Sequence, residues 1–329
     1  MAKDAAAYRN TLLTLWVALS AIAFYYAFTH QNIPFHIAIS FTIAALVETA
    51  FYLAPGFVWS RALIESIEPA PVRAFVLTIT AVIPYLIYAI GTGTFHWSSF
   101  GLLALLATVL TSWFVVQPGK RSIADILFVV FVAAVILSKA FGHIYILLAK
   151  PIAAEILGHL MWVRLGIFAI LTIREMGGID FGFLPTAKDW LIGLLSFAAF
   201  MPAALFTASL VHFTAPHAPV GPWWMTLTIA ARWMAAGLWV IALSEEFIFR
   251  GVLQQILAKH AGKIAGLFLA SVLFGLVHLP FGNQFPNWRH VAMATVLGLF
   301  CGISYWRAGS VRASMVTHAL AIASWKVFF

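Results

Sequence analysis

Long apolar segments recur along the whole chain, and they limit its possible folds more than any other feature. A helix needs about 20 predominantly apolar residues to cross the hydrocarbon core of a bilayer. Of the 329 residues, 63% are hydrophobic and only 9% are Asp, Glu, Lys or Arg, whereas an ordinary soluble domain has about 25% charged residues. The sequence therefore excludes a soluble fold and predicts an all-α, polytopic bundle of about ten or eleven transmembrane helices.

The expected spans follow from the positions of these segments. They lie at about 12–28, 37–53, 74–90, 100–116, 123–137, 152–171, 190–211, 223–243, 264–279, 291–305 and 313–328. The count depends on residues 139–151, where Lys139 and Lys150 interrupt an apolar run. Lys3 and Arg9 precede the first span as they would in a signal peptide, but no small-residue cleavage site follows, so a retained helix is expected.

Basic residues fall in alternate connections between the expected spans. They precede the first span and recur near residues 61–73, 120–121, 174–188, 259–263 and 307–312, while the connections at 30–36, 92–98 and 212–222 have none. Because Lys and Arg concentrate in cytoplasmic loops, we expect a multi-pass membrane protein with a cytoplasmic N-terminus. A bacterial inner membrane is the expected location, although the charge pattern gives only the orientation. The net charge of +8 is then explained by these loops, so the expected partner is the lipid bilayer and not a nucleic acid.

A polar stretch with several glycines and a proline, REMGGIDFGFLPTAKDW at 174–190, divides the chain. It predicts transmembrane helices of unassigned role at 1–184 and a second domain at 185–329. Upstream of it, Glu48, Glu155 and Arg164 lie inside apolar runs. Intramembrane charges are candidates for function, but no motif surrounds these three, and the favoured interpretation is structural pairing.

The second domain contains two adjacent carboxylates in the run SEEFIFRG. Placing them in an apolar helix is costly, so other groups must compensate their charge. Glu246 and Arg250 are four residues apart and share a helix face, where they can form an ion pair. Glu245 points about 100° away from Glu246 around the helix and is left without that partner.

Two histidines are expected at the same depth as Glu245. Glu245 lies 15 residues before His260, and His278 lies 15 residues after Lys263, so a hairpin turning at 260–263 places both about 22 Å from its turn. His318 has a comparable depth in the final span. Each feature alone has a structural explanation, such as a helix-packing histidine. Together, Glu245, Glu246, Arg250, His278 and His318 indicate a hydrolytic site.

Three segments resemble a known family. EEFIFRG at 245–251 resembles the EExxxR motif of CPBP intramembrane proteases, which include CAAX-processing enzymes and bacterial Abi proteins. FGLVH at 274–278 is similar to their FxxxH motif, and GLFCGISYWRAGSVRASMVTH at 298–318 is similar to their third region. The resemblance covers residues 185–329.

The resemblance implies an intramembrane endopeptidase that needs no cofactor or metal. Its substrate would be a membrane protein or a lipidated peptide, cleaved near a C-terminal signal. Glu245 would activate the attacking water, Glu246 and Arg250 would hold the site together, His278 would assist proton transfer or bind the oxyanion, and His318 would belong to the oxyanion pocket. The family pattern HxxxN ends in Asn, but Ile322 occupies that position here.

Other functions remain open at this stage. Glu245, His278 and His318 could bind a catalytic Zn²⁺ ion, although no HExxH motif is present. A transporter or an immunity-type binding protein could use the same polar cluster to hold a ligand. Cys301 lies mid-helix and is interpreted as a packing residue. As the single cysteine, it permits no intramolecular disulfide.

Overall fold

The computed structural model describes residues 1–29, 33–117, 119, 122–146, 148, 153–213, 217–218, 221–282 and 285–329. This part of the chain forms two compact units, Met1–Gly177 and Gly178–Phe329. Eight of its helices are long and apolar enough to cross a membrane, and two shorter apolar helices accompany them. The prediction of an all-α, polytopic helix bundle is confirmed. The expected domain boundary after residue 184 lies a few residues inside the second unit.

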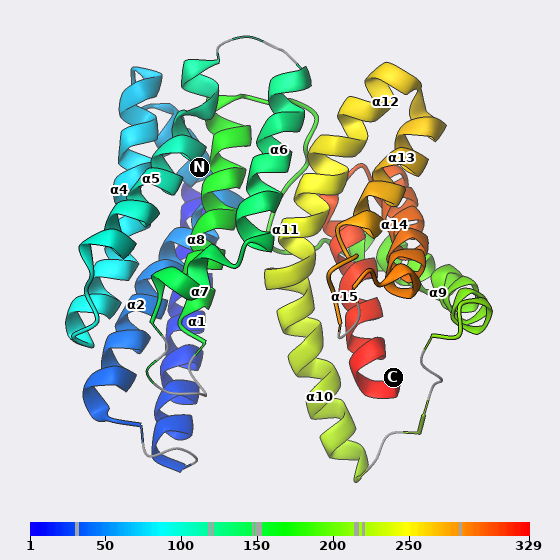
Figure 1. Cartoon of the computed structure of the whole chain (residues 1–329), viewed down its shortest axis with the longest axis horizontal. Coiled ribbons are helices and arrows are strands. Elements are labelled where there is room, and N and C mark those ends of the chain that lie inside the picture. Colours follow the sequence, from blue (N-terminus) through cyan, green and yellow to red (C-terminus); the bar gives the residue numbers. More distant parts are fainter. Residues whose placement is uncertain are drawn as a thin grey trace. The chain divides into compact units, whose positions relative to one another are not determined.

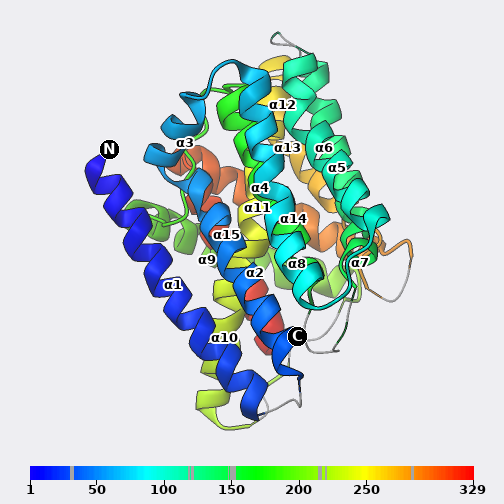
Figure 2. The ribbon, with the colours of Figure 1, turned by 90° about the vertical axis from the view of Figure 1, so that its left-hand side faces the viewer.

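The first unit contains the helices numbered α1 to α8, of which α1 and α2 lie side by side (Figures 1 and 2). Within residues 139–151, the described part contains only the short α7. The helices are α1 (Ala2–Thr29), α2 (Phe35–Leu53), α3 (Val58–Glu65), α4 (Ala70–Gly91), α5 (Trp97–Val116), α6 (Ser122–Leu137), α7 (Ala140–Ile144) and α8 (Glu155–Phe168).

A buried ion pair joins α2 and α8 within the first unit. Arg164 Nε donates to Glu48 Oε1 at 2.7 Å, and the two side chains are 1% and 0% exposed. The remaining guanidinium nitrogens donate to the hydroxyl and the carbonyl of Thr80 on α4, each at 2.8 Å. A buried charge is tolerated when it is paired and its hydrogen-bonding capacity is used. This arrangement supports the structural interpretation of Glu48 and Arg164.

The second unit contains a helix of 39 residues, Trp223–Ala261, that carries the acidic pair near its middle. Two π-helical segments, Gly237–Ala242 and Phe247–Gln254, flank the acidic turn, and such irregular turns are frequent at functional sites. The helices of this unit are α9 (Ala187–Leu210), α10 (Trp223–Ala236), α11 (Leu243–Glu246), α12 (Gln255–Ala261), α13 (Lys263–Leu276), α14 (Trp288–Ala308) and α15 (Val311–Phe328).

A glycine turn connects α12 to α13. Gly262 has φ 86°, a left-handed conformation that L side chains rarely adopt. The chain reverses there, and α12 and α13 pack side by side (Figure 1). This turn is the predicted hairpin at 260–263, and it returns α13 along the helix that bears Glu245.

The start of α15 is anchored to the start of α9. Thr186 caps α9 in a capping box with Asp189, which satisfies backbone N–H groups that the helix leaves free. Arg312 at the start of α15 contacts Asp189 at 3.3 Å and Asp180 at 2.5 Å. Gly193 on α9 lies against Val316, and a Cβ atom there would come within 2.6 Å of that side chain. Small residues allow such close helix packing in membranes, which fixes α15 and hence His318.

Candidate active site

Glu246 and Arg250 form the buried base of the candidate site. Arg250 Nε donates to Glu246 Oε2 at 2.9 Å, and both side chains are completely buried. The pairing follows from their four-residue spacing, which places both on one helix face. The Arg250 guanidinium also lies 5.2 Å from the ring centroid of Phe274 on α13. The two charges therefore compensate each other as the sequence predicted.

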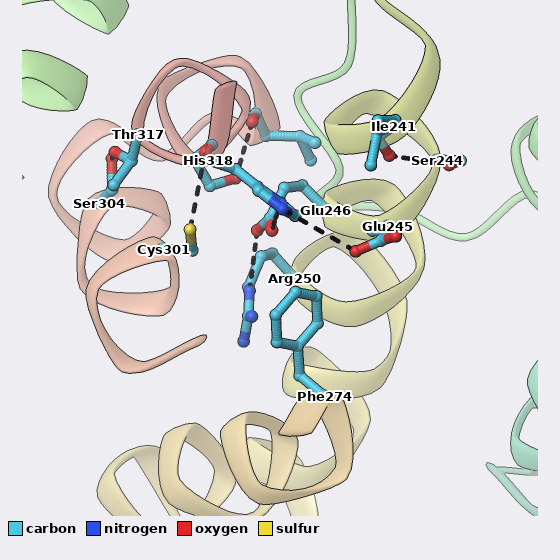
Figure 3. Close-up of polar contacts among 12 residues, drawn as sticks. Ile241, Ser244, Glu245, Glu246, Arg250, Phe274, Cys301, Ser304, Thr317 and His318 are labelled. Atoms are coloured by element: carbon cyan, nitrogen blue, oxygen red, sulfur yellow. Dashed lines mark hydrogen bonds and ion pairs between the residues drawn. The ribbon is translucent and has the colours of Figure 1, made fainter. Parts of the chain in front are cut away.

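His318 on α15 contacts the other oxygen of the Glu246 carboxylate. Its Nδ1 lies 2.8 Å from Glu246 Oε1, and its ring packs edge-on against Phe274 with centroids 5.6 Å apart. Figure 3 shows Glu246 between Arg250 and His318. Both oxygens of Glu246 are thus engaged, and Glu246 holds His318 in a fixed orientation.

Glu245 lies beside both histidines. Its Oε2 is 4.0 Å from Nε2 of His278 and 4.0 Å from Nε2 of His318. This oxygen is buried and has no hydrogen-bond partner among the described residues, although the side chain as a whole is 27% exposed. A buried carboxylate oxygen without a partner is unusual, and it leaves an acceptor free for a water or a substrate group.

The partners of the two imidazoles fix where their protons lie. His278 Nδ1 is 2.7 Å from the carbonyl oxygen of Phe274, and a carbonyl oxygen can only accept. Nδ1 of His278 must therefore carry a proton, as must Nδ1 of His318 beside the Glu246 carboxylate. In its neutral form each ring presents an acceptor at Nε2 toward Glu245, and in its doubly protonated form Nε2 donates instead. Glu245 Oε2 therefore faces two nitrogens that can accept or donate a hydrogen bond, depending on the protonation of each ring.

A water molecule fits the observed spacing better than a zinc ion does. Two atoms 4.0 Å apart that each accept a hydrogen bond of about 2.8 Å from one water subtend about 90° at its oxygen. Zn²⁺ bonds of about 2.1 Å to the same two atoms would subtend about 145°, instead of the tetrahedral value of about 109°. As placed, Glu245, His278 and His318 do not match a tetrahedral zinc site.

A second group of possible metal ligands lies deeper in the unit. Side-chain atoms of Glu246, Cys301 and His318 are within 4.8 Å of one another, and all three residues are buried. Both carboxylate oxygens of Glu246 are already bonded, one of them to the Arg250 cation. The guanidinium would repel a metal ion at this place, so this group is unsuited to bind one.

A cavity of about 370 Å³ opens beside Glu245, and residues of α9, α10, α14 and α15 form much of its lining. Its polar wall includes Glu245, His278 and His318, and most of the remaining wall is aliphatic or aromatic. This combination of an apolar pocket with a few convergent polar groups is typical of ligand sites. Ile322 lines the cavity in place of the family Asn and supplies no hydrogen-bond donor there.

The structure brings all five predicted residues together, and it adds two that the sequence interpretation missed. His290 at the start of α14 stacks on His278, with ring centroids 5.6 Å apart and planes 12° from parallel. Lys326 near the end of α15 lines the same cavity. The only sequence signal for Lys326 is that it follows His318 on one helix. For His290 we find none.

Comparison with known proteins gives one match. Residues 223–323 match the family model described as "Type II CAAX prenyl endopeptidase Rce1-like", and this range includes all five predicted site residues. No curated protein and no solved structure is significantly similar to the chain. The resemblance inferred from the three sequence motifs is thereby confirmed, and residues 223–323 carry a domain of the Rce1-like CAAX protease family, whose members are membrane endopeptidases.

Proposed function

We propose that this protein hydrolyses a peptide bond of a membrane-associated substrate with a water molecule activated by Glu245. The observation that carries the proposal is the position of Glu245 Oε2. It has no hydrogen-bond partner among the described residues, it lies on the wall of a cavity, and it faces Nε2 of two histidines at 4.0 Å each.

In the proposed reaction, a water donates one hydrogen to Glu245 Oε2 and the other to Nε2 of a neutral His278. Glu245 removes a proton as the water oxygen attacks the carbonyl carbon of the scissile bond, so the oxygen–carbon bond forms and the carbonyl becomes an oxyanion. Collapse of this intermediate breaks the carbon–nitrogen bond, and Glu245 returns the proton to the leaving amine. A positioned general base of this kind contributes about 10²- to 10⁴-fold in rate.

The oxyanion needs a hydrogen-bond donor, and Ile322 cannot supply one. We propose that Nε2 of His318 donates instead, which requires the doubly protonated ring. The Glu246 carboxylate at Nδ1 offsets the positive charge of that ring. Thr317 is unsuited, because its hydroxyl already contacts Ser304 and the backbone of Gly193 and Ala313.

The cavity favours an apolar substrate. Its aromatic and aliphatic wall suits a lipidated peptide or a transmembrane segment. Binding there is favourable because the free energy falls when apolar surface leaves a more polar environment. The family description names prenyl substrates, and a C-terminal Cys-a-a-X sequence is the usual site of prenylation. We therefore propose a membrane protein or lipidated peptide cleaved near its C-terminus.

The test uses the purified chain in nanodiscs with two fluorogenic peptides of the same apolar sequence, one carrying a prenylated cysteine in a Cys-a-a-X end and one unmodified. We expect cleavage by the wild type and a loss of about 10²- to 10⁴-fold in Glu245→Gln, because an amide cannot accept the proton. Binding of both peptides should survive this substitution. Retained cleavage in Glu245→Gln would refute the mechanism.

Metal analysis of the same preparation distinguishes a zinc hydrolase from the proposed metal-free glutamate mechanism. Stoichiometric zinc, lost together with activity after treatment with a chelator and restored by added zinc, would replace the glutamate mechanism with a metal mechanism. Peptide binding without any cleavage by the wild type would instead identify a binding protein.

A further inference from the structure

His278 lies just beyond the last turn of α13, where the regular helix no longer holds its backbone. α13 ends at Leu276, and the backbone N–H of His278 donates to the carbonyl of Gly275 in a tighter turn. One edge of the His278 ring is fixed by the hydrogen bond from Nδ1 to the carbonyl of Phe274. The other edge carries Nε2, which is 4.0 Å from Glu245 Oε2 and too far for a direct hydrogen bond. The direction of Nε2 therefore depends on what packs against the faces of the ring.

The imidazole of His290 on α14 is stacked on the His278 ring. The two ring centroids are 5.6 Å apart and the planes are 12° from parallel. Phe281 also lies against His278, at 4.9 Å between centroids, but its ring is tilted by 32° and its side chain is exposed. His290 is half-buried, and Phe213 packs edge-on against it at 5.7 Å. His290 is thus the more nearly parallel neighbour of His278, and another ring holds it in place.

Asn287 joins the start of α14 to the segment that follows His278. Its backbone N–H donates to the carbonyl of Leu279 at 3.0 Å, and its Nδ2 donates to the carbonyl of Phe281 at 2.8 Å. Its Oδ1 accepts from the backbone N–H of His290 at 3.1 Å and caps α14. These three hydrogen bonds fix the separation of the two backbone segments that carry the stacked imidazoles.

We propose that His290 is a positioning residue, which by stacking on His278 holds that ring in the plane that directs Nε2 toward the water beside Glu245. This inference rests on the proposed function, and it adds to the site a residue that takes no part in the proton transfers. Both imidazoles line the candidate active-site cavity. A group that contacts the reacting water must stay in a narrow range of orientations for the reaction to be fast.

The expected size of the effect follows from the strength of ring stacking. The free energy that a stacked aromatic pair adds beyond area burial corresponds to a factor of about three to ten in the population of one orientation. The loss of the stack should therefore lower the rate of the chemical step by this factor. Substrate binding should change little, because the orientation of His278 matters for the attack of the water and not for the bound peptide.

The test replaces the ring at position 290 in two ways. His290→Leu keeps an apolar side chain but removes the flat ring, whereas His290→Phe keeps a flat ring and removes both ring nitrogens. Cleavage of the prenylated fluorogenic peptide in nanodiscs gives kcat and KM. We expect His290→Leu to lower kcat by about threefold to tenfold and to change KM by less than about twofold. His290→Phe should stay within about twofold of the wild-type kcat, because stacking is restored.

Trp288→Leu is the matched control, because it also removes an aromatic ring from the start of α14. Trp288 is 60% exposed and does not line the cavity, so kcat and KM should both equal those of the wild type. Thermal unfolding shows whether each variant is folded at the assay temperature. If His290→Leu is not folded, His290→Phe decides the question, since a large loss of kcat in this variant contradicts a role through stacking.

A second measurement reports the stack without requiring cleavage. The ring current of a stacked aromatic ring changes the NMR frequencies of the His278 ring protons. In detergent micelles, isotope-labelled histidine gives these signals, and their absence from the spectrum of His278→Gln assigns them. We expect the His278 signals to move in His290→Leu and to stay close to their wild-type positions in His290→Phe. Unchanged His278 signals in His290→Leu overturn the proposal.

The combined results separate this inference from the proposed function. Wild-type kcat in His290→Leu, with activity lost in Glu245→Gln, rejects the positioning role and leaves the protease standing. Equal losses in His290→Leu and His290→Phe also reject it, because His290 would then act through a ring nitrogen. A wild type that cleaves nothing, but whose His278 signals respond to His290→Leu, rejects the protease and leaves His290 as a packing partner only.

Discussion

Nδ1 of His318 lies 2.8 Å from Oε1 of Glu246, although 72 residues separate them in the sequence. The same carboxylate accepts a hydrogen bond from Arg250, four residues further along its own helix. Glu246 therefore connects the local acidic motif to the last helix, and its removal should affect more than one partner.

We expect Glu246→Gln to lower both stability and activity, because it leaves Arg250 buried without its counter-charge. Breaking a buried ion pair in this way costs about 3 to 5 kcal/mol. Thermal unfolding in detergent and peptide cleavage measure the two effects. Glu65→Gln is the control, because Glu65 is exposed and a surface change of this kind stays within about 0.5 kcal/mol. A Glu246→Gln protein as stable as the wild type would contradict the assigned role.

Ile322→Asn restores the family residue on the face of α15 that also bears His318. Residues four apart on a helix are neighbours, and both line the cavity. If the chain is a protease, the new amide should raise the cleavage rate or leave it little changed, since in the proposed mechanism His318 supplies a donor. In a binding protein, the same substitution would weaken binding of apolar ligands without creating cleavage. His318→Ala, measured in parallel, should lower cleavage by about 10²- to 10³-fold; undiminished activity would place the oxyanion pocket elsewhere.

The Glu48–Arg164 pair in the first unit allows a test of structural pairing. Glu48→Gln should destabilise the protein by about 3 to 5 kcal/mol, because Arg164 loses its buried partner. The double variant Glu48→Leu with Arg164→Met removes both charges and should recover much of this loss. Thermal unfolding compares the stabilities of the single variant, the double variant and the wild type. If the double variant is no more stable than Glu48→Gln, the pair has a role beyond charge compensation.

The orientation of the chain in the membrane is tested by labelling. The alternation of basic loops predicts that Lys3 and Lys263 face the cytoplasm. Single cysteines at these two positions, in a Cys301→Ser background, should resist an impermeant thiol reagent in intact cells and react after lysis. The accessible control is a cysteine at Trp97, which begins α5 on the side of the membrane predicted to face away from the cytoplasm. Labelling of position 3 or 263 in intact cells would contradict the predicted orientation.

The spacing of residues along the sequence was sufficient to predict several features of the site. The four-residue spacing of Glu246 and Arg250 predicted their ion pair, because a helix places such residues on one face. Equal distances to the turn predicted that Glu245 and His278 lie at the same depth, and Glu245 Oε2 is 4.0 Å from His278 Nε2. The roles of these residues in catalysis remain predictions.

The bundle of membrane helices and the acidic motif are predictable from the amino-acid sequence, because hydrophobic length and helical period are local properties. The pairing of Glu48 with Arg164, the contact of His318 with Glu246 and the position of Lys326 in the cavity of Glu245 became known only from the packed helices. These relationships join helices that are distant in the sequence. They depend on how closely the helices pack, as at Gly193 against Val316, and local periodicity does not encode which helices become neighbours.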